Sequence, residues 1–176
     1  IIARMGENSD HSFHQVRRQL ERNDPVLTKL KIAYGEGGVR PGDYYPLDGD
    51  WERDGRSVGG NTHINEVEFF EPFAVQREDM GIFLRGLAGN KSITKLTFTL
   101  CDFPWGDIFE TLVPFFKNNG RFDSPKICCP GDDCFLPLIS ALSEFNSLKE
   151  FEYSGNEGVE GAIDDDKARA LVRALA

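Results

Sequence analysis

The stretch ITKLTFTLCDF, residues 93–103, carries the pattern that decides the fold. With Ile93 as position one, apolar residues occupy positions one, four and six, and Cys101 occupies position nine. Side chains alternate between the two faces of a strand, so positions four and six would point inward while positions three, five and seven point outward. The stretch therefore predicts a strand with one buried face.

The same frame recurs along the chain. Expected strands start near residues 27, 64, 93, 122 and 148, at intervals of 37, 29, 29 and 26 residues. Between them, apolar residues take three- and four-residue steps, which are typical of amphipathic helices. We expect Asn61, Asn90 and Asn146 to end these helices, because Asn tolerates the left-handed conformation. The recurrence indicates stacked units in which a helix connects two parallel strands.

The run L-x-x-L-x-L-x-x-C/N-x-L, repeated at this period, resembles the leucine-rich repeat of the ribonuclease-inhibitor-like type. The resemblance extends from about Leu27 to the C-terminus, with Cys101 and Asn156 as the family's Cys or Asn at position nine. It implies an α/β fold, a right-handed solenoid or horseshoe with a parallel sheet on the concave side and helices on the convex side. Residues 50–53 and 61–64 also resemble the large leucine-rich-repeat families of single-celled algae.

The chain would divide into two regions. Residues 1–26 are expected to form an N-terminal capping helix region, since a stacked array needs its first edge covered. Residues 27–176 would form the repeat domain, with an insertion at residues 35–50 that lengthens the first interval. Because the chain opens with Ile1 and ends within an expected helix, we interpret it as a fragment of a longer repeat array.

The composition argues against several classes of function. A net charge of −9 is unsuited to neutralising phosphates, so we expect no nucleic-acid binding and favour a protein partner of basic character. No stretch approaches the roughly 18–20 apolar residues of a membrane span. Four Cys residues, three of them within residues 128–134, indicate a reducing, intracellular and cytoplasmic setting. Without a C-x-x-C pair or a nearby His, they predict no metal site.

Three motifs resemble catalytic or ligand-binding sequences. Residues 55–59 match the G-x-S-x-G nucleophile elbow, but they lie inside an expected helix rather than between a strand and a helix. Residues 50–55 resemble the start of an EF-hand, whose twelfth position would be Asn61 instead of Glu. Residues 89–92 resemble the end of a phosphate-binding loop and contain a glycosylation sequon, yet a strand follows them. We therefore expect no catalytic residue, no cofactor and no enzymatic activity.

The outward positions of the strands predict a binding surface. The leading hypothesis is a protein–protein interaction scaffold that binds through its concave strand face. Anchors would be Tyr34, Phe70 and Leu100, and the surrounding charged or polar residues would be Lys31, Glu68, Thr97, Lys126 and Glu152.

Two interpretations of this surface stay open. In one, adjacent strands bring Lys31 beside Glu68 and Lys29 beside Glu66 and Lys95, so that the charges only satisfy one another. In the other, loops or a neighbouring repeat cover the apolar anchors. Alternative functions implied by the resemblance are a GTPase-activating scaffold and the substrate-recognition part of a ubiquitin ligase.

Overall fold

The computed structural model describes residues 7–33, 43–44, 49–70, 76–99, 110–119, 126–128, 139–140 and 152–154. Its strands form one six-stranded sheet in the order β2-β1-β3-β4-β5-β6, and every neighbouring pair is parallel. The strands are β1 Lys29–Ala33, β2 Asp43–Tyr44, β3 Glu66–Phe70, β4 Lys95–Thr99, β5 Lys126–Cys128 and β6 Glu152–Ser154.

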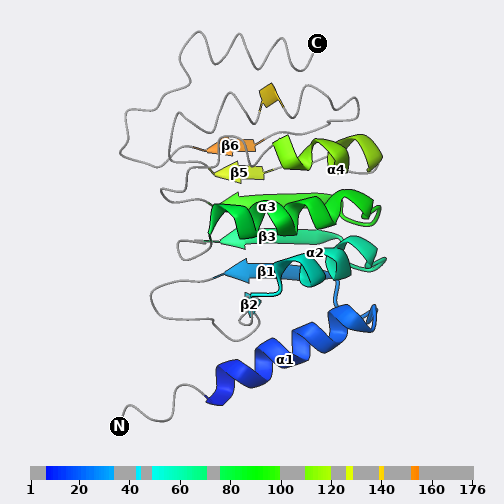
Figure 1. Ribbon diagram of the computed structural model, residues 1–176, viewed down its shortest axis with the longest axis vertical. Coiled ribbons are helices and arrows are strands. Elements are labelled where there is room, and N and C mark those ends of the chain that lie inside the picture. Colours follow the sequence, from blue (N-terminus) through cyan, green and yellow to red (C-terminus); the bar gives the residue numbers. More distant parts are fainter. Residues whose placement is uncertain are drawn as a thin grey trace.

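The described helices follow one another beside this sheet in chain order (Figure 1). They are α1 Glu7–Glu21, α2 Trp51–Gly60, α3 Arg77–Gly86 with the 3-10 turn η1 Leu87–Gly89, and α4 Val113–Asn118. In Figure 1, α2, α3 and α4 lie in front of the strands, and α1 lies beyond the β2 edge of the sheet. The two faces of the sheet therefore have different surroundings.

The inward positions of the strands form the core. The alternation predicted from the sequence is confirmed in β1, β3 and β4, where the residues at positions four and six are at most 1% exposed. Phe69 and Phe98 stack across β3 and β4 with their ring centroids 4.9 Å apart. Phe83 of α3 meets Phe69 edge-on, which joins the helix layer to the sheet.

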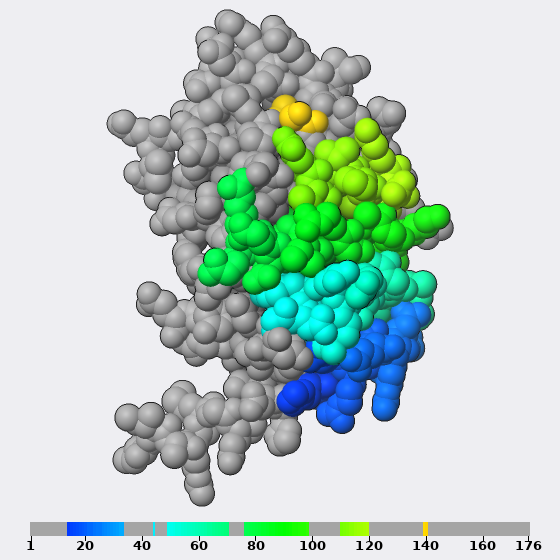
Figure 2. Space-filling view, viewed as in Figure 1, coloured from blue at the N-terminus to red at the C-terminus, as the bar shows by residue number. Residues whose placement is uncertain are grey.

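Glycines set the distance between α2 and α3, which are in direct contact on the helix side of the molecule (Figure 2). A Cβ atom on Gly55 would lie 2.6 Å from the carbonyl oxygen of Phe83, and one on Gly59 would overlap the carbonyl oxygen of Gly86. The G-x-S-x-G match at residues 55–59 is therefore a helix-packing surface. Its glycines allow two backbones to touch, and Ser57 lies within α2 rather than on a strained turn.

Buried asparagines connect the successive units. Asn61, Asn90 and Asn119 follow one another at 29-residue intervals and are at most 2% exposed. The side-chain oxygen of Asn90 accepts hydrogen bonds from the backbone N–H groups of Ser92 and Ile93, at 2.8 Å each. Its amide nitrogen donates to the carbonyl oxygens of Val58 and Asn61 in the preceding unit, also at 2.8 Å. The Asn90 amide thus shapes its own loop and attaches it to the previous one.

The sequence predicted these helix ends for a different reason. Asn61 and Asn90 have extended backbone angles, with φ of −73° in both, so the left-handed conformation expected there is wrong. Their side-chain hydrogen bonds explain why Asn stands at these positions. Asn119 was not anticipated, although it continues the 29-residue interval, and Asn146 lies outside the described residues.

A buried carboxylate joins the first elements of the chain. Asp54 of α2 is 2% exposed and accepts a hydrogen bond from the hydroxyl of Tyr44, which is itself buried in β2. The guanidinium of Arg17 in α1 lies 3.6 Å from the other oxygen of Asp54. Asp50 caps α2 by accepting from the backbone N–H of Arg53. Asp50 and Asp54, two acids of the EF-hand-like stretch, therefore both have partners within the fold.

The prediction of a right-handed leucine-rich-repeat solenoid or horseshoe of the ribonuclease-inhibitor-like type is wrong. The described units are unequal: β1 and β3 are separated by β2 and the ten-residue α2, whereas β4 and β5 are separated by the six-residue α4. The structure is a small α/β domain with a parallel sheet. The repeat interval in the sequence arises because a helix connects each pair of parallel strands. A leucine-rich-repeat solenoid and a small α/β domain both contain such connections. The interval therefore could not distinguish the two folds.

We expect Gly59→Ala to lower the free energy of unfolding by about 1–3 kcal/mol, because the new methyl group would force α2 away from Gly86. Gly60→Ala is the matched control, since a Cβ there meets nothing within 4 Å. The control should stabilise the protein by about 0.5 kcal/mol through the better helix propensity of Ala. Urea unfolding of both variants measures the difference, and equal effects would contradict the packing role.

We expect Asn90→Ala to lower the free energy of unfolding by about 2–4 kcal/mol, because buried N–H and carbonyl groups on both sides lose their partner. Asn118→Ala removes an exposed amide with one long contact to Ala88 and should change stability by less than about 0.5 kcal/mol. Thermal and urea unfolding would test this contrast. A mild effect at Asn90 would show that water replaces the amide.

Candidate functional site

The side of the sheet opposite α2, α3 and α4 is the candidate site, and we call it the open face. It consists of the outward side chains of the three strands whose side chains the structure describes: Lys29, Lys31, Glu66, Glu68, Phe70, Lys95 and Thr97. These seven residues are partly or largely exposed, whereas Ala33, the outward residue beside Phe70, is only 4% exposed. The hydroxyl oxygen of Thr97 is buried and has no hydrogen-bond partner among the described residues. The alternation of the strands thus presents a polar surface on a rigid sheet.

Ion pairs cross the strands of the open face. Lys29 places its Nζ atom 3.1 Å from Glu66 and 3.0 Å from Glu68, and Lys95 places its Nζ atom 3.0 Å from the same oxygen of Glu66. The strand register sets Lys29, Glu66 and Lys95 side by side. The lateral pairing predicted for these three residues is confirmed.

These contacts shift two pKa values. The hydrogen bonds that Lys29 donates to Glu68 and Glu66 raise the pKa of Lys29 above its ordinary value. Partial burial raises the pKa of Glu66, but the hydrogen bonds from Lys95 and Lys29 outweigh it and lower the pKa. Both groups therefore stay charged at neutral pH, and the open face keeps its pattern of charges.

Phe70 lies at the end of β3 and is covered on one side by a cation. The ammonium group of Lys31 lies 4.3 Å from the centroid of the Phe70 ring, which is a cation–π arrangement. The strand register pairs Ala33 of β1 with Phe70, so Lys31 reaches diagonally across to the ring. Phe70, a predicted anchor, and Lys31, a predicted charged residue, are thus in direct contact.

The structure brings together four of the predicted site residues: Lys31, Glu68, Phe70 and Thr97. Lys126 and Glu152 continue the same register line by their backbone positions in β5 and β6, and their side chains are not described. Tyr34 and Leu100 lie outside the described residues. The role of all eight in binding remains a prediction.

Three residues of the open face were missing from the predicted anchors and surrounding charges. Lys29, Glu66 and Lys95 occupy position three of the repeated frame, and their alternating charges were visible in the sequence. The geometry adds that Glu66 is shared by two lysines from its two neighbouring strands. The charged residues at position three were the feature of the sequence from which these three site residues could have been predicted.

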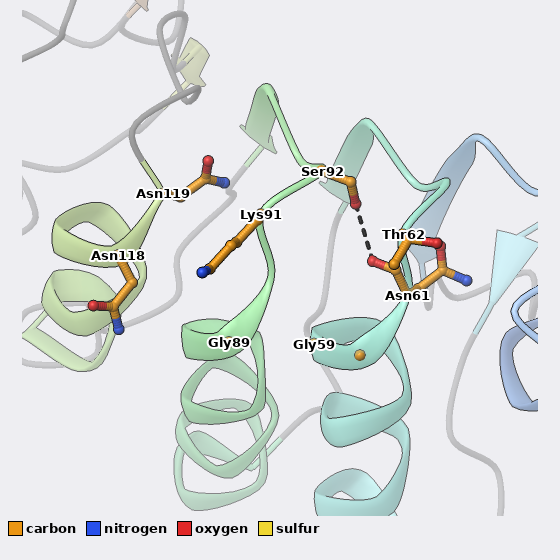
Figure 3. A pocket seen from close by; sticks show the side chains of 9 residues that line it. Gly59, Asn61, Thr62, Gly89, Lys91, Ser92, Asn118 and Asn119 are labelled. Atoms are coloured by element: carbon orange, nitrogen blue, oxygen red, sulfur yellow. Dashed lines mark hydrogen bonds between the residues drawn. The ribbon is translucent and has the colours of Figure 1, made fainter.

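A second candidate is a cavity of about 590 Å³ at the C-terminal ends of the helices (Figure 3). Its lining includes Gly59, Lys91, Ser92 and Asn118, and Lys91 points toward Asn118. Helix C-termini present carbonyl oxygens and the negative end of the helix dipole, so this cavity is unsuited to phosphate. The P-loop-like match at residues 89–92 is therefore a helix-to-strand connection.

The sequon at residues 90–92 is also explained by this connection. The amide nitrogen of Asn90, to which a glycan would attach, is buried and donates to two carbonyl oxygens. Ser92 donates its hydroxyl hydrogen within the same cluster of loop carbonyls. Attachment of a sugar would require the loss of these contacts, so the sequon is a structural element of the fold.

Metal ligands and membrane-spanning helices are both missing from the described part of the chain. Within the described ranges there is no group of three or more His, Cys, Asp or Glu residues that could hold a metal ion. No described helix is long and apolar enough to cross a membrane.

The ion pairs of Glu66 predict a pH dependence of stability. Because the folded pKa lies below the ordinary 4.5, their contribution should be complete above about pH 4.5 and disappear as the pH falls through the lowered value. The half-exposed lysines limit it to about 0.5 kcal/mol. Urea unfolding of Glu66→Gln and the natural chain should show a difference at pH 7 that shrinks as the pH falls below 4.5. A difference that stays constant through the whole acid titration would count against this assignment.

Comparison with known proteins gives a likeness of fold. No protein-family model and no curated protein matches the sequence. Among solved structures, "Leiomodin-1 Actin-Binding Site 2 (ABS2)" matches 92% of this chain and 88% of its own, with a TM-score of 0.58. The tropomodulin C-terminal domain of Caenorhabditis elegans matches 93% and 90%, with a TM-score of 0.53.

Both structures are 14% identical to this chain, so the likeness concerns the fold alone. It corrects the expected resemblance to the ribonuclease-inhibitor-like leucine-rich repeats and to the algal repeat families. The chain has the fold of the tropomodulin and leiomodin domains over nearly its whole length.

Proposed function

We propose that this chain is a protein-binding domain whose open face contacts the partner. The observation that carries the proposal is the asymmetry of the sheet: helices occupy one face, and the described part of the other face presents partly exposed charges around Phe70. Phe70 and Lys31 supply an aromatic group and a cation on rigid strands, a combination that suits a binding contact. Rigid strands also reduce the entropy lost on association.

Actin is the partner that the fold suggests first. The leiomodin domain is by its own name an actin-binding site, and it shares its fold with 92% of this chain. At 14% identity, individual contact residues cannot be transferred from one to the other, so the proposal concerns the partner and not its contacts. An actin-binding role would agree with the expected intracellular setting.

The residues that resembled catalytic motifs support a role without catalysis. Ser57 lies in α2 between glycines that pack against α3, and Asp54 is held by Tyr44 and Arg17. The nucleophile elbow needs a turn between a strand and a helix, and Ser57 lies within a helix instead. The GTPase-activating and ubiquitin-ligase alternatives depended on the leucine-rich-repeat resemblance and lose their basis with it.

We expect the chain to co-sediment with filamentous actin or to bind monomeric actin in analytical ultracentrifugation. Phe70→Ala should weaken this binding by about tenfold or more if the open face makes the contact. Arg56→Ala, on the exposed side of α2, is the matched control and should bind like the natural chain. Both variants should keep the far-ultraviolet spectrum and unfolding midpoint of the natural chain.

Two results would count against the proposal. Absence of binding to either form of actin would remove actin as the partner. Equal weakening by Phe70→Ala and Arg56→Ala, or unfolding of the Phe70→Ala variant, would remove Phe70 as a contact residue.

A further inference from the structure

The charges of the open face are not equally accessible. Lys29 and Lys95 have 48% and 46% of their side chains exposed, whereas Glu66 and Glu68 have 21% and 20%. The carboxylates therefore lie lower, beneath and between the lysines. A partner that approaches the sheet meets the ammonium groups first.

The hydrogen-bonding capacity of these groups is also uneven. An ammonium group has three N–H donors, and Lys95 uses one of them, toward Glu66. Lys29 uses two, toward Glu66 and Glu68. Within the described part of the chain, Lys95 therefore retains two donors in the middle of the sheet, since β4 is one of its two central strands.

Among the side chains of the open face that the structure describes, the summed charge differs in sign from the charge of the chain. Three lysines, at positions 29, 31 and 95, accompany two glutamates, at positions 66 and 68, which leaves an excess of one positive charge. The chain as a whole carries −9. At physiological salt, charges farther away than about 8 Å are largely screened, so the local excess decides what binds on contact.

We infer that the open face docks an acidic segment of a partner protein, with Lys95 and Lys29 as the carboxylate-binding residues. Phe70 beneath Lys31 would contact an apolar side chain of the same segment. This inference rests on the proposed function and refines its partner class. It also replaces the basic partner that the net charge alone had suggested.

The test uses fluorescein-labelled peptides of about twelve residues in which Glu and Ser alternate around one central Leu. Fluorescence anisotropy with the whole chain should show binding of this peptide that weakens between about 50 and 300 mM NaCl. A peptide with Lys in place of Glu should bind more weakly. Lys95→Gln should reduce the affinity for the acidic peptide by about three- to tenfold, the range of one ordinary hydrogen bond at an exposed site.

Lys91→Gln is the matched control, because it removes the same charge from an exposed lysine at the helix C-terminal edge. It should bind the acidic peptide like the natural chain. Equal losses in Lys91→Gln and Lys95→Gln, tighter binding of the basic peptide, or tighter binding to phosphatidylserine vesicles than to the acidic peptide would each overturn the inference.

The outcome can be separated from that of the actin experiment. Actin binding together with no binding of the acidic peptide would overturn the inference and leave the proposed function standing. Lys95-dependent binding of the acidic peptide without any binding of actin would support the inference and remove actin as the partner.

Discussion

The buried amide of Asn90 is the contact on which the arrangement of the domain depends. A chain that leaves a helix and enters a parallel strand carries backbone N–H groups into the interior, and these need partners. The oxygen of Asn90 satisfies two of them, while its nitrogen bonds the carbonyl oxygens of the preceding unit. The start of β4 is therefore fixed relative to that of β3, its neighbour in the sheet.

The alignment of neighbouring strands determines the arrangement of charges on the open face. With β1, β3 and β4 in register, Lys29, Glu66 and Lys95 stand in one line and Glu66 is shared between two lysines. A slip by one residue would turn every outward side chain inward, so the inward Leu and Phe residues hold the charges in place. The polar surface and the core are two results of the same register.

The close contact of α2 and α3 explains a motif that sequence reasoning could only set aside. A match to G-x-S-x-G indicates catalysis when a strand and a helix flank it, and the absence of that context made a helix the better interpretation. It did not say why the glycines are there. The facing backbones of Gly55, Gly59 and Gly86 supply the reason, since no larger residue would fit between them.

By itself, the sequence determined the positions of β1, β3, β4, β5 and β6, the inward Leu and Phe residues and the lateral pairing of Lys29, Glu66 and Lys95. Alternation and a 29-residue interval are local properties of the chain. The sequence missed β2, which lies in the stretch expected to be an insertion. Only the tertiary structure decided that the units form a small α/β domain. It also decided that Asn side chains rather than left-handed turns end the helices, and that lysines project above glutamates on the open face. These features depend on contacts between residues that are far apart in the sequence. A periodic pattern is compatible with more than one set of such contacts, so it could not specify them.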